Sequence, residues 1–312
     1  MAGARLSGET DRWPNASFED GPERVMTSPT LASPAPSTMA SPVVTSLTVT
    51  VLGCGTSTGV PVVGCDCAVC RSNDPKNHRL RTGLALRVHV DATDSDDSGE
   101  PLILVDTSPD LRQQCLRFGL ERVDAVLFTH AHADHVFGLD DLRPYCFRRQ
   151  DPIDCYGSAA TLAQIEKTFA YVFDGVPSEG GGKPRVRSRP IDGTFEVYGL
   201  TVEALPVMHG SLEVTAYRAG PFAYVTDCSD IPRSSLERLR GLDILILDAL
   251  RYQPHPTHFS VAEAIEVAAE IGARTTYLTH MNHDIDYNAP QVDLPPGVEL
   301  AYDGLTCNVS FA

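Results

Sequence analysis

The sequence predicts a layered α/β fold in which several strands end at one common edge. Apolar runs of strand length alternate with longer segments of helical pattern, which is typical of such folds. Four apolar runs lead directly into a side chain that can bind a metal, at His130, His209, Asp227 and His280. Because the carboxyl ends of strands meet at one edge of a layered fold, we expect these side chains to gather there.

Length and charge narrow the class of protein. The chain has 312 residues, of which 42% are hydrophobic, which is enough to bury a substantial core. Its formal net charge of −16 repels polyanions, so a nucleic-acid partner is disfavoured. No apolar run is long enough to cross a bilayer, and the N-terminus lacks the pattern of a secretory signal. We therefore expect a cytoplasmic protein that does not enter a membrane.

The chain divides into a tail and one folded domain. Residues 1–46 are rich in Pro, Ser, Thr and Ala, a composition that cannot form a packed core, and we expect them to be disordered. From residue 47 onward the pattern of apolar and polar residues becomes typical of strands and helices, so residues 47–312 are expected to form the functional domain.

Apolar spacing and turn residues predict the elements of that domain. Strands are expected at 47–52, 84–90, 102–105, 125–129, 153–156, 200–205, 223–226, 244–248 and 276–279. Helices are expected at 111–118, 161–173, 234–239 and 261–271. The strands at 84–90 and 102–105 are predicted to form a hairpin across an acidic, solvated loop.

The strongest local signal follows the strand at 125–129. Within six positions the sequence Thr129-His130-Ala-His132-Ala-Asp134-His135 places three imidazoles and one carboxylate. Such ligands suit Zn²⁺, Mn²⁺ or iron, and a loop after a strand can direct alternate side chains to two neighbouring ions. The sequence therefore predicts a metal centre here.

This motif resembles the signature of the metallo-β-lactamase superfamily, His-X-His-X-Asp-His after a strand. The resemblance implies a four-layer αββα fold, with two mixed β-sheets between helices. It also implies three later ligands in the chain order His, Asp, His, which His209, Asp227 and His280 match. By this resemblance, the first metal would bind His130, His132, His209 and Asp227, and the second Asp134, His135, Asp227 and His280. Asp227 would bridge the two ions, and Asp106 would support the motif loop.

A second metal site is predicted by Cys65-Asp-Cys67-Ala-Val-Cys70, which places three thiols in six residues. The chain has nine cysteines, an odd number that does not suit a disulfide framework. A fourth ligand is needed, and His283, three residues after His280, is the best candidate. Three thiolates and one imidazole form a closed tetrahedral zinc site with a structural role.

The cysteine motif with its downstream histidine narrows the resemblance to the cyclic-phosphate phosphodiesterases of the carbon–phosphorus lyase pathway. This resemblance implies a small phosphodiester substrate, a catalytic pair of Mn²⁺ or Zn²⁺ ions, a structural Zn²⁺ and a possible homodimer. His258, ahead of the helix at 261–271, matches the histidine with which such enzymes assist the leaving group. We expect Asp134 and His258 to be catalytic, and Asp248 to orient a histidine.

Two other functions remain open. The 3′-tRNA-processing endonucleases share these ligands, but the net charge of −16 argues against a tRNA partner. A metal-carrying accessory protein is the non-enzymatic alternative, because the B proteins of pyrroloquinoline quinone biosynthesis resemble this chain too. A lactamase or thioesterase has no obvious use for His258 or the cysteine motif.

Overall fold

The computed structural model describes residues 43–91, 99–147, 149–176, 182–291 and 293–311. The predicted disorder of residues 1–46 therefore falls almost entirely outside the described residues. The first strand begins at Val44 rather than at residue 47, because Val44 and Ser46 already pair with the neighbouring strand. The ordered strand thus extends three residues into the segment predicted to be a tail.

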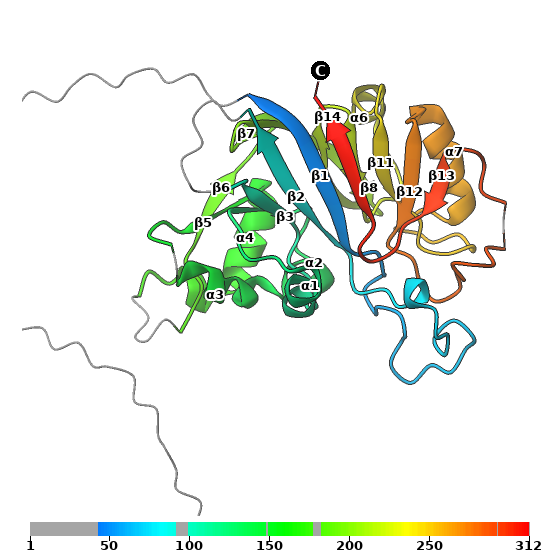
Figure 1. Ribbon diagram of the computed structural model, residues 1–312, viewed down its shortest axis with the longest axis horizontal. Helices are drawn as coiled ribbons and strands as arrows, with labels where there is room; N and C mark the ends of the chain where they lie inside the picture. Colours follow the sequence, from blue (N-terminus) through cyan, green and yellow to red (C-terminus); the bar gives the residue numbers. More distant parts are fainter. Residues whose placement is uncertain (1–42, 92–98, 148, 177–181, 292, 312) are drawn as a thin grey trace, which may run out of the picture. The chain divides into compact units, whose positions relative to one another are not determined.

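The domain contains two mixed sheets of seven strands each (Figure 1). In spatial order, the first sheet consists of β14 (Thr306–Ser310), β1 (Val44–Gly53), β2 (Gly83–Val90), β3 (Leu102–Val105), β4 (Ala125–Leu127), β5 (Ile153–Gly157) and β6 (Val186–Pro190). The second consists of β13 (Val298–Leu300), β12 (Thr275–Thr279), β11 (Ile244–Asp248), β10 (Phe222–Val225), β9 (Leu212–Ala219), β8 (Leu200–His209) and β7 (Thr194–Val197). The predicted hairpin of β2 and β3 is present, with Leu84 opposite Val105.

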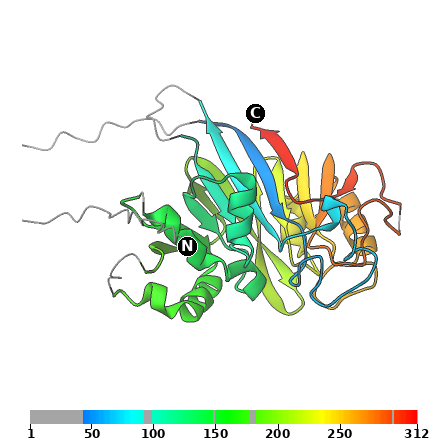
Figure 2. The ribbon, with the colours of Figure 1, turned by 60° about the horizontal axis from the view of Figure 1, so that its bottom comes forward.

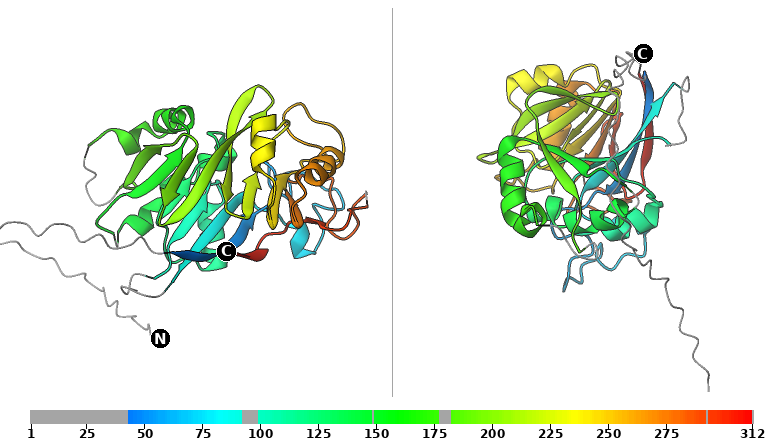
Figure 3. Two further views of the ribbon diagram at one scale, coloured as in Figure 1. Left: turned by 90° about the horizontal axis from the view of Figure 1, so that it is seen from above. Right: turned by 90° about the vertical axis from the view of Figure 1, so that its left-hand side faces the viewer.

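Helices cover the outer faces of the two sheets. They are α1 (Leu111–Phe118), α2 (Ala133–Val136), α3 (Arg143–Cys146), α4 (Ala159–Thr168), α5 (Ala170–Phe173), α6 (Arg233–Arg238) and α7 (Val261–Ile271), with short 3₁₀ turns at Pro75–Asn77 and Leu139–Leu142. Figure 2 brings forward the green helices that follow β3, β4 and β5, and Figure 3 shows α6 and α7 outside the second sheet. The predicted four-layer αββα arrangement is confirmed.

Strand β3 shows why the layers stack in this way. Its four residues are all buried, and successive side chains of a strand point to opposite faces. Ile103 and Val105 join the core between the two sheets, whereas Leu102 and Leu104 join the core beneath the helices. A continuous apolar run is therefore what a strand between two layers requires.

One predicted helix is divided in two. The expected helix at 161–173 becomes α4 and α5, because Phe169 leaves helical geometry at φ −107° and ψ 41°. The ring of Phe169 is buried in the core beneath the helices, 6.0 Å from the ring of Phe137. Burial of this side chain therefore outweighs the helix propensity of the segment, and the helix is interrupted at Phe169. None of the helices among the described residues has the length and apolar character needed to cross a bilayer.

The parallel halves of the two sheets bring the predicted strand ends together. Strands β3 and β4 run parallel in the first sheet, and β10, β11 and β12 run parallel in the second. The residues just past three of these strands have positive φ, at Asp106 (64°), Asp227 (51°) and His280 (61°). Residues other than glycine rarely adopt this conformation, and such strain concentrates at functional sites.

Candidate metal centre

The loop after β4 is held by a carboxylate from β3. The backbone amide and hydroxyl of Thr129 both donate to Asp106 at 2.8 Å, and Nδ1 of His135 donates to it at 2.8 Å. Burial raises the pKa of Asp106, and these donors offset part of that rise. Because Nδ1 of His135 is engaged in this way, its Nε2 is the nitrogen that faces the centre. Asp106 thus supports the motif loop as predicted.

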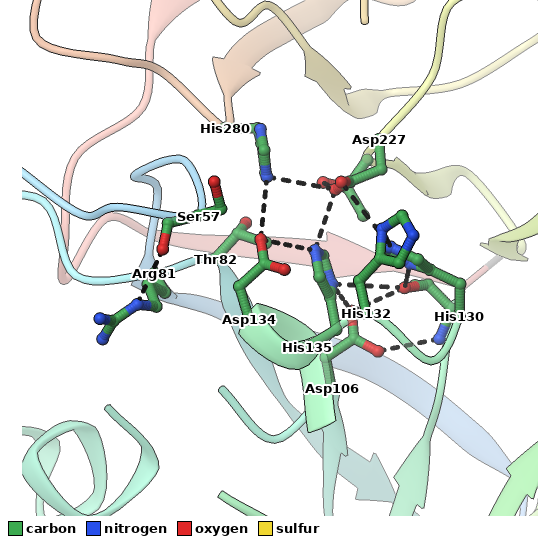
Figure 4. Close-up of polar contacts among 12 residues, drawn as sticks. Ser57, Arg81, Thr82, Asp106, His130, His132, Asp134, His135, Asp227 and His280 are labelled. Atoms are coloured by element: carbon green, nitrogen blue, oxygen red, sulfur yellow. Dashed lines mark hydrogen bonds and ion pairs between the residues drawn. The ribbon is translucent and has the colours of Figure 1, made fainter. Parts of the chain in front are cut away.

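The structure brings the seven predicted catalytic ligands into two clusters that share Asp227 (Figure 4). In each cluster the possible ligand atoms all lie within 4.8 Å of one another; the clusters are His130, His132, His209 and Asp227, and Asp134, His135, Asp227 and His280. Oδ2 of Asp227 lies 3.8 Å from Nε2 of His130 and 3.9 Å from Nε2 of His209. Oδ1 lies 3.1 Å from Nε2 of His135 and 3.4 Å from Nε2 of His280. One carboxylate oxygen therefore faces each cluster.

The donor atoms fit a pair of divalent cations. Among the side chains that the structure describes, Nε2 of His135 and both ring nitrogens of His280 are buried without a hydrogen-bond partner. They face carboxylate oxygens at short range but do not hydrogen-bond to them. Buried imidazole nitrogens are normally satisfied, and a cation between nitrogen and oxygen would satisfy both. Imidazole and carboxylate ligands suit Zn²⁺, Mn²⁺ or iron.

Electrostatics support the same interpretation. Burial opposes the charge on Asp227, but the imidazoles of His135 and His280 hold its pKa well below the usual range. Burial also opposes a proton on His280, yet Asp227 and Asp134 raise its pKa to about 9. Asp227 and Asp106 likewise raise the pKa of His135 well above its usual value. In the protein without metal, protons therefore partly take the place of the cations.

The predicted assistant histidine lies beside this centre. Nδ1 of His258 lies 3.1 Å from Oδ1 of Asp248, and the two imidazole rings of His258 and His280 stack at 4.7 Å. The same carboxylate also accepts hydrogen bonds from the backbone amide of Asp227 at 3.2 Å and from that of Phe259 at 3.0 Å. Asp248 is fully buried and orients His258 as predicted, and it also ties that histidine to Asp227, which the two clusters share.

Helix α7 begins directly after this histidine. Ser260 caps the helix by accepting from the amide of Glu263, and the side chain of Glu263 accepts in return from the amide of Ser260. This reciprocal pair sets the first turn of the helix. The cap at Ser260 determines where the segment carrying His258 ends.

Thr257 contributes to the site although the sequence did not point to it. Its carbonyl oxygen accepts from Nδ1 of His209 at 2.6 Å, so Nε2 of His209 is directed to the first cluster. Every residue type has a main-chain carbonyl, so the identity of residue 257 does not reveal this contact. The position of Thr257, one residue before His258, was the available signal.

The three cysteines converge on His283. Nδ1 of His283 lies 3.2 Å from Sγ of Cys65, 3.7 Å from Sγ of Cys67 and 3.4 Å from Sγ of Cys70. The amide of Cys70 donates to Sγ of Cys67 at 3.4 Å and lowers the pKa of that thiol to about 7. All four side chains have ligand atoms within 4.8 Å of one another, as a tetrahedral zinc site requires.

A short segment after β12 joins the two sites. It carries His280 at one end and His283 three residues later, and Figure 1 shows it beside the cyan loop that follows β1. The guanidinium of Arg79, which is fully buried, donates to the carbonyl of Asn282 at 2.9 Å and to that of Ile285 at 2.6 Å. The cluster of three cysteines with His283 and the side chain of Arg79 together hold the backbone from which His280 extends.

Comparison with known proteins agrees with this geometry. A family model described as a beta-lactamase superfamily domain matches residues 102–281, which is more than half of the chain. The chain therefore belongs to the beta-lactamase superfamily, and its two His/Asp clusters have the ligand types that could hold the metal ions of a hydrolase of that fold. The predicted family membership is confirmed.

Three relatives narrow the position of the chain within this superfamily. A crystal structure of a diphosphatase from the PhnP family is 40% identical, with a TM-score of 0.76 over 86% of this chain and 98% of that one. An octanoyltransferase of Porphyromonas gingivalis is 40% identical over 256 residues, covering 81% of this chain; the chain spans only 50% of that protein. A coenzyme PQQ synthesis protein B of Methylobacterium nodulans is 30% identical over 229 residues, or 64% of this chain and 71% of that protein.

Proposed function

We propose that this protein hydrolyses a small phosphodiester or diphosphate at the centre that Asp227 bridges. The observation that carries the proposal is His258, held by Asp248 and stacked on His280 at 4.7 Å. A hydrolase that only needed to activate water would have no use for a buried, carboxylate-bound histidine beside its second cluster. Support also comes from the 40% identity to a diphosphatase over nearly its whole length.

Each ligand has a role in this proposal. His130, His132, His209 and Asp227 would hold one ion, and Asp134, His135, Asp227 and His280 the other. When bound, the two ions would supply the activation of water and the neutralisation of charge on the phosphoryl group. Asp134 would also orient the water for attack on phosphorus. Mn²⁺ and Zn²⁺ both suit this ligand set, and a third, structural Zn²⁺ would bind Cys65, Cys67, Cys70 and His283.

His258 would act on the leaving side of the reaction. Its Nδ1 is engaged by Asp248, so Nε2 is free to donate a hydrogen bond to a phosphoryl oxygen. The same proton can pass to the departing oxygen as the bond to phosphorus breaks. The carboxylate of Asp248 holds the ring in the orientation that this role requires.

The substrate is proposed to be a small molecule, either a cyclic ribose or nucleotide phosphate or a diphosphate. A chain with a net charge of −16 would repel an extended polyanion, which disfavours precursor tRNA. The acyl transfer named for the Porphyromonas protein belongs to a chain of which this one spans half. We extend the proposal to a soluble homodimer, as the family resemblance implies.

Turnover and metal content, measured on one preparation, test the proposal. The substrates are bis-p-nitrophenyl phosphate, 5-phosphoribosyl 1,2-cyclic phosphate and a nucleoside diphosphate ester. We expect about three metals per chain, two in the bridged pair and one at the cysteines, with hydrolysis of at least one substrate. Full metal content without turnover of any of them would contradict the proposal and favour a metal-carrying accessory protein.

A further inference from the structure

A second histidine lies on the leaving side of the proposed centre. His255 precedes His258 by three residues, and the two ring centroids are 5.3 Å apart. Its side chain is half-buried, so part of the ring is accessible from solvent. His255 belongs to neither metal cluster, and none of the roles described above uses it.

The orientation of His255 is set by Thr257. The backbone amide of Thr257 donates to Nδ1 of His255 at 3.4 Å, and the hydroxyl of Thr257 lies 3.2 Å from the same nitrogen. A backbone amide is only a donor, so Nδ1 must accept, and the proton of the neutral ring lies on Nε2. Burial, together with the nearby side chains of His258 and Arg251, lowers the pKa of His255, which favours this neutral form.

Thr257 is itself fixed by the metal centre. Its carbonyl binds the ring of His209 at 2.6 Å, and its side chain packs against Gly210, where an added Cβ would lie 2.8 Å from the Thr257 methyl. The segment from His255 to His258 therefore cannot shift without disturbing the first cluster. It presents two imidazoles from fixed positions, each with Nδ1 engaged and Nε2 free.

We propose that Nε2–H of His255 binds the leaving group, and that the preferred substrate is a diphosphate whose leaving group is itself a phosphate. This inference rests on the proposed function. His258 lies next to His280 and would contact the oxygen that bridges the two phosphorus atoms of the substrate. His255, on the side of His258 away from the clusters, would contact the leaving phosphate. A charged phosphate oxygen is a far stronger acceptor for this donor than an aromatic ring.

The reaction balances without a further reactant. Water adds to the scissile phosphorus, and the bond from that phosphorus to the bridging oxygen breaks. The bridging oxygen leaves with the electron pair as part of the second phosphate. His258 donates the proton that this oxygen takes up, and a proton from the attacking water replaces it. His255 keeps its own proton and contributes only a hydrogen bond.

Two kinds of substrate and two variants at His255, all with the metal-loaded enzyme, test this role. ADP-ribose and diadenosine diphosphate carry a phosphate leaving group, whereas bis-p-nitrophenyl phosphate carries an aromatic one. His255→Phe keeps a ring but removes the donor, and we expect kcat/KM for the diphosphates to fall roughly 10- to 100-fold, mainly through KM. The loss on bis-p-nitrophenyl phosphate should be at least tenfold smaller. His255→Gln restores a donor and should recover most of the diphosphate activity.

Thr257→Val is the matched control, because it removes the hydroxyl at His255 but keeps the carbonyl that binds His209. It should show a smaller loss with the same preference between substrates. Equal losses on both substrate types, or no loss on either, would overturn the role of His255. A parent enzyme that cleaves bis-p-nitrophenyl phosphate but neither diphosphate would overturn the substrate class alone. Inactivity of the metal-loaded parent on every phosphate ester would instead overturn the proposed function.

Discussion

The two proposed metal sites of this protein are built in opposite ways. The binuclear centre takes four ligands from residues 130–135 after β4 and the other three from the ends of β8, β10 and β12, and the packing of two sheets brings them together. The cysteine site takes three of its four ligands from six consecutive residues in a loop outside the sheets. One site is a product of the fold, and the other is a local motif closed by a single distant histidine.

Their surroundings differ accordingly. Ligands of the binuclear centre are held by partners of their own, such as Asp106 for His135 and the Thr257 carbonyl for His209. Around the cysteines, only Val60, Val69 and Cys70 form a buried apolar cluster, and Val63 is 98% exposed. We expect the binuclear centre to keep its shape without metal, whereas the cysteine loop should depend on zinc for its structure.

Removing the bridge should have the largest effect on activity. Asp227→Asn takes away the one charge that both clusters share, and it leaves the positive charge on His135 and His280 to be balanced by the remaining carboxylates alone. We expect loss of both catalytic metals and a fall in turnover of about 10⁴-fold or more, because metal activation of water and phosphoryl group is lost together. Metal analysis should still find one zinc per chain. A variant that kept three metals would contradict the assignment of Asp227 as the bridge.

His258→Ala should separate catalysis from metal binding. The variant should lose about 10²- to 10³-fold in kcat, as is usual when a proton donor is removed, with metal content equal to that of the parent. His89→Ala, on the outer face of β2, is the matched control for loss of a histidine. Loss of metal from the His258 variant would show that this residue is a ligand rather than a proton donor.

Lowering the pH should gradually weaken metal binding at the binuclear centre. The pKa of His280 is raised to about 9, so below about pH 9 its ring carries a proton in the metal-free protein, and the pKa of His135 is raised well above its usual value. Binding of metal must displace these protons, and the apparent affinity should therefore fall as the pH falls, by up to about tenfold per unit for each proton released. Titration of metal into the apoprotein at pH 6, 7 and 8 measures this slope. An affinity that does not change with pH would exclude proton displacement.

Cys67→Ser should act on stability more than on chemistry. Loss of one thiolate should release the structural zinc and lower Tm by about 5–10 °C, which corresponds to roughly 2–3 kcal/mol in a domain of this size. Because His283 is tied to the segment of His280, a modest loss of activity should follow. Cys155→Ser, at a buried thiol in β5 that belongs to neither proposed metal site, controls for the substitution itself. Unchanged zinc content in the Cys67 variant would dismiss the structural site.

The contrast between the sites also explains what the sequence could predict. Ligands that follow strand patterns, such as His130 and Asp227, were recognisable because residue type and position both signal a site. Helices at 111–118 and 261–271 have the predicted bounds, since their apolar spacing and their glycine ends agree. Strand β9 was missed although Gly210-Ser211 between two alternating runs is a hairpin signal.

Contacts made by the main chain were beyond sequence reasoning. The carbonyl of Thr257 and the carbonyls that bind Arg79 depend on how the segments fold, and any residue could supply them. The basic residues Arg187 and Arg189, which could have attracted a phosphate, instead pair with Asp154 on β5. Only tertiary structure shows whether a surface charge is already engaged.

The smallest expected effect concerns the cap beside His258. Ser260→Ala removes the side chain that accepts from Glu263 and should cost about 1 kcal/mol, lowering Tm by about 2–4 °C. Turnover should stay within about twofold of the parent, because His258 is held by Asp248 and Thr257 is held by His209, and neither contact involves the cap. A much larger loss of activity with intact metal content would show that the start of α7, rather than the strand ends, positions the assistant histidine, and the binuclear centre would then depend on local structure as the cysteine site does.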